Sequence, residues 1–280
     1  MKNIDVKAAA IGRAAGFLLI ACTLTRLVFA QEQEAAQVDA SDPTKIYSYA
    51  GLGFKFTEFA NGDSLNELRA IGNIGFSDQD MVLFEIGYGD YSGTVLPGEK
   101  GSGVTNGRAR YFHLFDMDYT VAKGYRGWAT QVDLQFEGSV KGTSGGNTLA
   151  LGVLPAYGGG PSWSFFLPVN FVSTWGSDFN KHQGNGASIA PLATYAPENG
   201  PWPGFYLQIW PSFTRYFSGD LSGEGGAALD LTTGWAITPT IIATATFQQN
   251  FDKDLKLYSP RTGTSGPNDW NLFANVSYYF

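Results

Sequence analysis

The alternation of apolar and polar side chains, repeated over segments of about ten residues, constrains the fold of this chain most. In residues 128–137, Trp128, Val132 and Phe136 fall on one face of the alternation, and Asp133 and Glu137 fall on the other. Successive side chains of a β-strand point to opposite faces of its sheet, so this period predicts strands with one apolar face and one polar face. No long segment has the 3.6-residue period of an amphipathic helix. The sequence therefore predicts an all-β fold.

The alternation recurs from residue 46 to the C-terminus and predicts about twelve strands. Short links rich in Gly, Pro, Asp and Ser lie at 77–80, 158–161 and 238–239, and longer links lie at 93–107, 175–187 and 252–268. Tight turns at one end and long loops at the other are typical of an up-and-down antiparallel barrel. The predicted strands cover residues 46–58, 65–76, 81–92, 107–118, 127–139, 147–157, 162–174, 188–196, 204–217, 225–237, 240–251 and 269–280.

Residues 1–30 have the features of an export signal. Lys2, Lys7 and Arg13 precede an apolar run over 14–25, and residues 28–30 fit a cleavage site with small side chains. One open alternative is a retained membrane anchor, although the run is shorter than the ~20 residues that span a bilayer. The other is a lipoprotein box over 19–22, with Cys22 as the lipidated residue. We predict a signal peptide over 1–30, a flexible tail over 31–45 and a barrel over 46–280.

The composition indicates that the apolar face of this barrel meets lipid. Charged residues are 15% of the chain, against roughly 25% in ordinary soluble domains. The polar face carries ionisable side chains in mid-strand, and burying these in a dry interior is costly. Side chains alone fill a ring of about eight strands, so a ring of about twelve is too wide for them. A two-sheet sandwich escapes this argument, and the export signal and the end of the chain favour the membrane barrel over it. The formal net charge of −7 argues against a nucleic-acid-binding protein.

The end of the chain carries the most specific motif. Tyr278, Tyr279 and Phe280 close the sequence, and apolar residues occupy alternate positions back to Trp270. This segment resembles the C-terminal strand of Gram-negative outer-membrane β-barrels. The resemblance covers 46–280 as a pattern and implies a transmembrane barrel in the outer membrane, exported through the periplasm, with a periplasmic tail. It also implies that Tyr278 and Phe280 form a signal for the barrel-assembly machinery, and that the partners include lipid and lipopolysaccharide.

In size and predicted strand count the chain is similar to nucleoside channels and to outer-membrane transporters found with phenol-degradation pathways, without a diagnostic motif of either. We therefore expect passive passage of small solutes through a polar lumen, with no cofactor, no metal and no catalytic residue. The charges either line a hydrated pore in opposed rows or pair and fill the lumen. The candidate pore-lining residues are Lys55, Glu67, Arg69, Glu85, Arg108, Arg110, Asp133, Glu137 and Asp230. The candidates for inward-facing aromatic side chains are Phe112, Phe166, Tyr206 and Trp210.

Two rival functions stay open. The first is a barrel enzyme that acts on lipid, which needs a base beside a nucleophile. The candidate bases are His113, on the apolar face of its predicted strand, and His182, in a loop near Ser177 and Ser188. The second rival is a barrel with a plugged lumen that serves as a structural or adhesive protein. The acidic pairs at 116/118 and 252/254 lack the further ligands of a calcium loop, so we interpret them as solvated carboxylates.

Overall fold

The computed structural model describes residues 38–140, 146–176, 179, 181–251 and 268–280. The predicted signal peptide, residues 31–37 of the predicted tail and the acidic pair at 252/254 lie outside these residues. No helix in the described part of the chain is long and apolar enough to cross a membrane. The strands are β1 (Tyr49–Phe59), β2 (Ser64–Gly75), β3 (Asp80–Tyr91), β4 (Ser102–Phe115), β5 (Lys123–Glu137), β6 (Asn147–Gly159), β7 (Trp163–Phe166), β8 (Val169–Trp175), β9 (His182–Ile189), β10 (Leu192–Tyr195), β11 (Tyr206–Tyr216), β12 (Gly225–Thr238), β13 (Ile241–Asn250) and β14 (Asn268–Tyr279).

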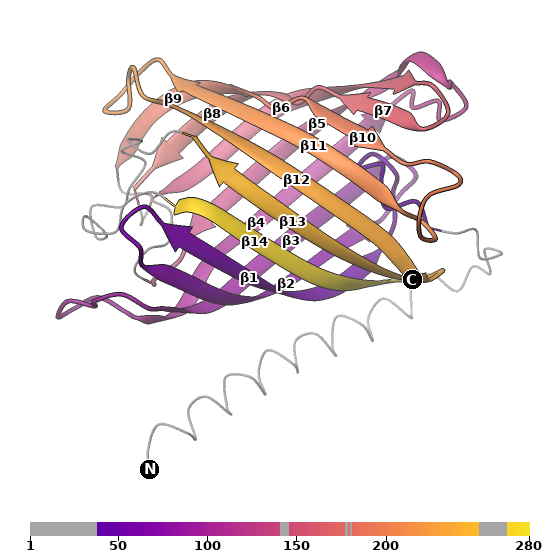
Figure 1. Cartoon of the computed structure of the whole chain (residues 1–280). Helices are drawn as coiled ribbons and strands as arrows, with labels where there is room; N and C mark the ends of the chain where they lie inside the picture. The colour runs from indigo at the N-terminus through magenta and orange to yellow at the C-terminus, as the bar shows by residue number, and fades with distance from the viewer. Residues whose placement is uncertain (1–37, 141–145, 177–178, 180, 252–267) are drawn as a thin grey trace. The chain divides into compact units, whose positions relative to one another are not determined.

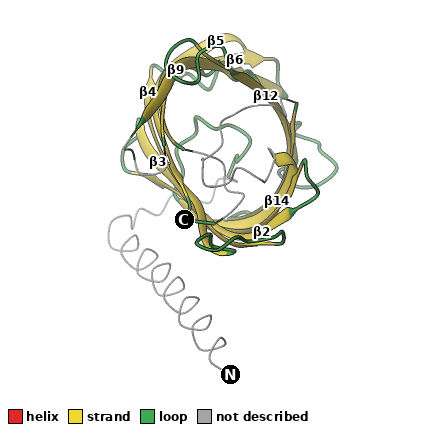
Figure 2. Cartoon of the chain, turned by 90° about the vertical axis from the view of Figure 1, so that its left-hand side faces the viewer, coloured by secondary structure: helices red, strands yellow, loops and turns green. Residues whose placement is uncertain are grey.

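The sheet closes on itself into a barrel (Figure 1). Consecutive strands pair antiparallel, and the first strand, β1, pairs with the last, β14. β7 and β8 are two parts of one crossing of the wall, and so are β9 and β10, which makes twelve strands. A view along the axis shows the strands as a ring (Figure 2). The prediction of an all-β, antiparallel barrel of about twelve strands is confirmed.

The eighth crossing begins earlier than predicted, at His182 instead of residue 188. Its first half contains Gly184 and Gly186 at inward, buried positions. A Cβ atom would lie 2.4 Å from the Ser218 backbone oxygen at Gly184, and 2.6 Å from the Arg215 backbone oxygen at Gly186. The neighbouring chain approaches too closely there for a side chain. A pattern of apolar side chains therefore cannot reveal this half-strand.

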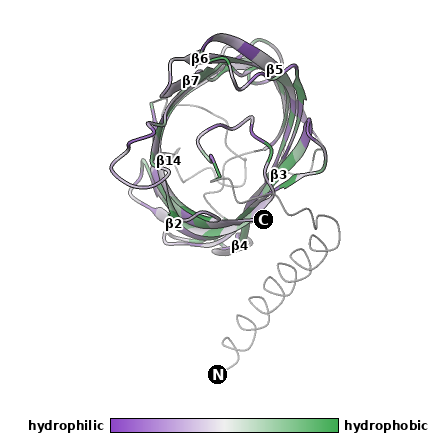
Figure 3. Cartoon of the chain, turned by 90° about the vertical axis from the view of Figure 1, so that its right-hand side faces the viewer, coloured by the Kyte–Doolittle hydropathy of each residue, from purple (hydrophilic) through white to green (hydrophobic). Residues whose placement is uncertain are grey.

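The two faces of the wall have opposite chemistry. On β1 and β2, Phe54 and Leu68 are about half exposed, at 52% and 51%, whereas Glu67 on the alternate face is 2% exposed. The polar face is the inner one, because residues 38–48 lie within the ring (Figure 3) and bond to polar side chains of both β2 and β11. The exposed apolar side chains therefore point outward. This orientation is the one expected for a barrel in lipid.

Four prolines interrupt the hydrogen-bond ladder at one level of the wall, and we call them the proline row: Pro155, Pro168, Pro191 and Pro211. Pro155 lies on β6, Pro168 lies between β7 and β8, Pro191 lies between β9 and β10, and Pro211 lies on β11. The register on either side places Pro191 opposite Pro211. Since proline has no N–H, neither residue can donate to the other.

At Pro155 and Pro168, one of the two backbone hydrogen bonds to the neighbouring strand is kept and the other is lost. Leu167 N donates to Pro155 O and Ala190 N donates to Pro168 O, both at 3.0 Å, but the reciprocal bonds are missing because the partner is proline. The Ala190 oxygen instead accepts from Trp210 Nε1 at 2.8 Å, from the inner face. The strand breaks at 167–168 and 190–191 therefore follow from proline chemistry, with the register continuous across them.

Candidate functional site

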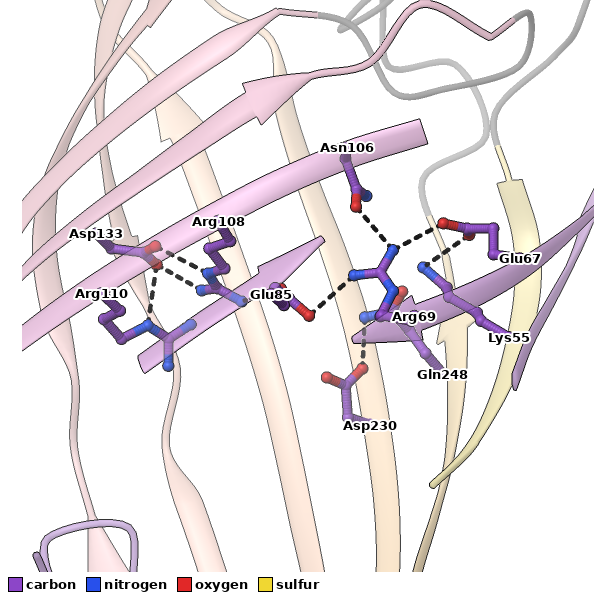
Figure 4. A network of polar contacts seen from close by, with 10 residues as sticks. All are labelled: Lys55, Glu67, Arg69, Glu85, Asn106, Arg108, Arg110, Asp133, Asp230 and Gln248. Carbon is purple, nitrogen blue, oxygen red and sulfur yellow. Dashed lines mark hydrogen bonds and ion pairs between the residues drawn. The ribbon is translucent and has the colours of Figure 1, made fainter. Parts of the chain in front are cut away.

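The inner face carries a connected group of charged side chains near the middle of the barrel, which we call the charged belt (Figure 4). All come from β1 to β5, on alternate positions facing the lumen. The register places opposite charges beside each other, which stabilises strand pairing. Its members are Lys55 opposite Glu67, Glu85 opposite Arg108, Arg110 opposite Asp133, and Arg69 between the two glutamates.

Arg69 is the most buried cation of the belt, with 6% of its side chain exposed. Its Nη1 lies 2.9 Å from Glu85 Oε2, and its Nη2 lies 2.9 Å from Glu67 Oε1 and donates to Asn106 Oδ1 at 2.8 Å. Gly87 on β3 leaves room for this arrangement, since a Cβ there would lie 2.5 Å from Glu67 Oε1. A guanidinium can satisfy several acceptors in fixed directions, so Arg69 fixes the relative positions of β2, β3 and β4.

The other end of the belt is built around Asp133. Arg108 donates to it twice, from Nε to Oδ1 at 2.8 Å and from Nη2 to Oδ2 at 2.5 Å. Arg110 Nε lies 3.3 Å from the same Oδ2, so two guanidinium groups share one carboxylate. Arg108 also lies 3.9 Å from Glu85, which links both ends of the belt. A third of the Arg108 side chain is exposed, so this end of the belt meets solvent.

A second polar row continues from β12 to β14. Gln248 Nε2 donates to Asp230 Oδ1 at 2.7 Å, and Asn271 Nδ2 donates to Gln248 Oε1 at 2.6 Å. Asn271 lies opposite Thr57 of β1, so this row reaches the strand that carries Lys55. Polar and charged side chains therefore line the inner wall from β12 through β14 and β1 to β5.

Glu137, the remaining pore-lining candidate, lies at the last position of β5. Its backbone N–H donates to Asn147 Oδ1 at 3.1 Å, at the end of the barrel that carries the long loops. The structure thus brings eight of the nine candidate side chains to the middle of the inner wall, whereas Glu137 lies at the rim. Their role in lining a pore stays a prediction.

At the level of the belt, the opposite side of the inner wall is polar but uncharged, and we call it the neutral wall; Arg126 bonds to Ser164 nearer the turn end. On β5, β8 and β9, Gln131 donates to Asn170, and Asn170 Nδ2 donates to Ser188 Oγ at 3.1 Å. On β6, β8 and β11, hydroxyl groups meet at Thr148, Thr174 and Tyr216. The candidate inward aromatics Phe112, Phe166 and Tyr206 are buried on inward positions, and Trp210 packs against the cluster that contains Phe112 and Phe166.

His182 contacts a serine other than those near it in sequence. Ser173 Oγ lies 3.0 Å from His182 Nε2 and donates to Asn185 Oδ1 at 2.9 Å. The same Nε2 lies 3.0 Å from Asn185 Oδ1. Which of these atoms donates depends on the tautomer of the histidine. The structure therefore places beside this candidate base a serine other than Ser177 or Ser188.

His113 lies on the outer face, away from the lumen. Its Nδ1 lies 2.7 Å from Asp80 Oδ1, which also accepts from the Tyr111 hydroxyl at 2.6 Å. The imidazole packs edge-on against Phe115, with ring centroids 4.4 Å apart. The histidine therefore belongs to a group of aromatic side chains at the end of the barrel near the β2–β3 turn. This position fits an interfacial aromatic girdle.

The feature that sequence reasoning missed is the packing of residues 38–45, described as part of a flexible tail. Ser41, Asp42 and Thr44 are buried, at 5%, 7% and 1% exposed. Hydrogen bonds within the segment and apolar contacts with the barrel hold these residues inside the lumen. Residues 38–45 of the predicted tail therefore pack inside the barrel, and the flexibility of the tail stays a prediction. The segment has no strand periodicity, and only the closed ring creates the surface on which it packs.

The C-terminal strand has the predicted arrangement. Tyr278 and Phe280 are exposed on the outer face, at 52% and 50%, and their rings stack with centroids 6.2 Å apart. Tyr279, on the alternate position, is buried inside. Phe280 N donates to Ser48 O at 3.0 Å, so the last residue is bonded to the chain just before β1.

Comparisons with known proteins support the fold. No protein-family model matches the chain, and its sequence matches no curated protein. An outer-membrane channel from Pseudomonas putida F1 superposes with a TM-score of 0.57 at 11% identity, over 88% of this chain and 100% of that one. The NanC porin superposes with a TM-score of 0.54 at 9% identity, over 83% of this chain and 100% of that one. The KdgM porin, in complex with disordered oligogalacturonate, superposes with a TM-score of 0.52 at 6% identity, over 82% of this chain and 99% of that one. The chain is therefore similar in fold to barrels of outer-membrane channels and porins.

Proposed function

We propose that this protein is an outer-membrane channel through which small polar solutes pass by diffusion. The observation that carries the proposal is a barrel with apolar side chains outside and a charged, partly solvated belt inside. In a soluble barrel the apolar face would fill the core, and here it points away from the lumen. The fold shared with known channels and porins supports the same function.

The charged belt suits weak binding of many solutes. Four cations and four carboxylates, counting Asp230, line the same level, so their formal charges cancel. Arg108 and Glu85 keep 33% and 25% of their side chains exposed, so a passing solute can exchange its water for bonds to them. Binding that is weak and spread over several sites permits exit as well as entry. We expect low selectivity between small anions and cations.

The orientation and the partners are part of the same proposal. The tight turns and the C-terminus would lie in the periplasm, because outer-membrane barrels have short periplasmic turns and long outer loops. The exposed apolar face would contact lipid and lipopolysaccharide. Tyr278 and Phe280 would be the residues read by the barrel-assembly machinery, which is consistent with their exposure beside the strand that closes the barrel.

Conductance tests the proposal. We expect discrete current steps when the purified protein, or a variant lacking residues 38–45, is added to a planar lipid bilayer in KCl solution. Detergent without protein is the control. Absence of steps from both proteins, although each migrates as a folded barrel, would contradict a channel and favour the structural or adhesive alternative.

A further inference from the structure

We propose that residues 38–45 form a plug that closes the turn end of the lumen and moves out as a unit when the channel opens. The turn end is the end with the β2–β3 and β12–β13 turns and the C-terminus. This inference rests on the proposed channel function, since a plug has meaning only in a conducting barrel. The segment lies inside the ring at this end (Figure 3).

The plug spans the lumen from one wall to the other. Tyr119, in the turn between β4 and β5, donates from its hydroxyl to Thr44 O at 2.8 Å. On the far side, Gln208 Nε2 of β11 donates to Ser41 O at 2.9 Å. Val38 and Ala40 pack against the buried cluster that contains Tyr206 of β11 and Tyr279 of β14. A segment that touches the β4–β5 turn, β11 and β14 at once obstructs the passage between them.

Most polar bonds of the plug are internal. Lys45 Nζ lies 2.6 Å from Asp39 Oδ2, and Ser41 N donates to Asp39 Oδ1 at 3.1 Å. Thr44 donates to Asp42 Oδ1 from its N–H at 2.9 Å and from its hydroxyl at 2.5 Å. These bonds do not depend on the barrel wall. The plug can therefore keep its own structure when it leaves the lumen.

The residues that follow the plug are held more firmly and form its anchor, Ile46–Ser48. Asn73 Nδ2 donates to Tyr47 O at 2.6 Å, and Gly75 N donates to Ser48 Oγ at 3.1 Å. Phe280 N bonds to Ser48 O, which ties the anchor to the C-terminus as well. Two backbone carbonyls join the plug to the wall, whereas the anchor is bonded to β2 and the chain end. The side-chain bond between plug and anchor, from Asp39 N to the Tyr47 hydroxyl, is long at 3.3 Å. We therefore place the hinge of the plug between Lys45 and Ile46.

The pKa values of two carboxylates of the plug are shifted in opposite directions. Burial raises the pKa of Asp42, outweighing its bonds from Thr44. Burial also acts on Asp39, but bonds from Lys45 and Ser41 prevail and lower its pKa. The charged groups nearby are Lys45, which lies over the Tyr119 ring, and the two carboxylates themselves. The negative charge of Asp42 therefore opposes docking, by which we mean packing of the plug inside the lumen. This opposition disappears as the pH falls below the raised pKa of Asp42.

Cross-linking tests the plug directly. The chain has a single cysteine, so a Cys22→Ser background allows Ser41→Cys and Gln208→Cys to be joined by a bis-methanethiosulfonate linker that dithiothreitol cleaves. We expect single-channel conductance in a planar bilayer to fall at least tenfold on cross-linking and to recover on cleavage. The control pair, Thr244→Cys with Asn275→Cys, joins neighbouring strands β13 and β14 inside the wall and should leave conductance unchanged.

The other outcomes separate the two proposals. Equal conductance of the cross-linked and the cleaved protein would overturn the plug and leave the channel intact. Silence of every variant, including the one lacking residues 38–45, would overturn the channel and with it the plug. In the uncross-linked protein we expect Asp42→Asn to lower the open probability several-fold. Asp39→Asn leaves the part-buried Lys45 of the docked plug without its counter-charge, so we expect it to raise the open probability several-fold. A change in the same direction for both would contradict a docked plug in which only Asp42 opposes docking.

Discussion

The charged belt and the neutral wall line the same lumen by different means. On β1 to β5, each charge lies beside an opposite charge on an adjacent strand, and Arg69 and Glu67 are almost fully buried. On β6 to β11, amides and hydroxyls such as those of Asn170, Thr174 and Tyr216 form neutral hydrogen bonds without any ion pair. The ladder behind the belt has no proline, whereas the neutral wall contains the proline row. Ion pairs and an uninterrupted backbone ladder therefore stabilise the side of the charged belt, whereas packing and neutral hydrogen bonds stabilise the neutral wall.

This difference predicts unequal sensitivity to mutation. Removing one member of a buried ion pair leaves an uncompensated charge, which is far more costly than losing a neutral bond. The belt should therefore behave as one unit, and the neutral wall as a set of separate contacts. Each prediction below compares a change in the belt with a matched change outside it.

The largest effect is expected for Arg69→Gln. It leaves Glu67 and Glu85 without their shared cation, so the free energy of unfolding should fall by about 3–5 kcal/mol. Asn170→Ala in the neutral wall, which leaves the Gln131 amide without its partner, should cost only about 1–3 kcal/mol. Urea unfolding of the folded barrel in detergent or liposomes measures both. Equal losses would show that burial of charge does not distinguish the two walls.

A smaller effect is expected on ion selectivity. Asp133→Asn frees Arg108 and Arg110 from their shared carboxylate and gives the belt an excess positive charge, so the reversal potential in a KCl gradient should shift toward chloride selectivity. Asp220→Asn changes the net charge equally, but this residue pairs with Lys181 on the exposed loops, where solvent screens it. We expect a clearly smaller shift for the control. Equal shifts would mean that the belt does not form the selective part of the path.

The smallest effect is expected for His182→Gln, which lies outside the charged belt. The histidine is exposed and its Nε2 lies 3.0 Å from the Ser173 and Asn185 oxygens, so a glutamine amide can replace one of these bonds and stability should change by less than about 1 kcal/mol. Conductance should not change. Purified protein should release no fatty acid from phospholipid vesicles, with or without the substitution. Hydrolysis that is lost in His182→Gln would revive the lipid-enzyme alternative.

The sequence predicted the barrel and the charged residues well because both depend on local rules. Alternation identifies strands, and oppositely charged inward residues on neighbouring strands, such as Glu85 and Arg108, are recognisable once the strand order is known. The pairing itself depends on register, which no single strand reveals. Opposed rows across the pore were one expectation; the structure instead pairs Arg69 and Arg108 along one wall.

Packing between distant segments could not be predicted in the same way. Residues 38–45 have no periodic pattern, and their partners Tyr119 and Gln208 are separated from them by much of the chain. The contact of His182 with Ser173 likewise depends on how β8 and β9 pair. Such contacts exist only after the ring has closed, so they require the three-dimensional structure.

The proline row has a mechanical consequence for the barrel. Between acyl chains no water is present to replace a missing backbone bond, so at a residue pair without ladder bonds the two strands are held by side-chain contacts alone. Where Pro191 faces Pro211, the barrel has a seam along which adjacent strands can separate at lower force than elsewhere. When the protein is pulled from a bilayer, the first tear should run between these two strands, and the stretch from β1 to β5 should come out last.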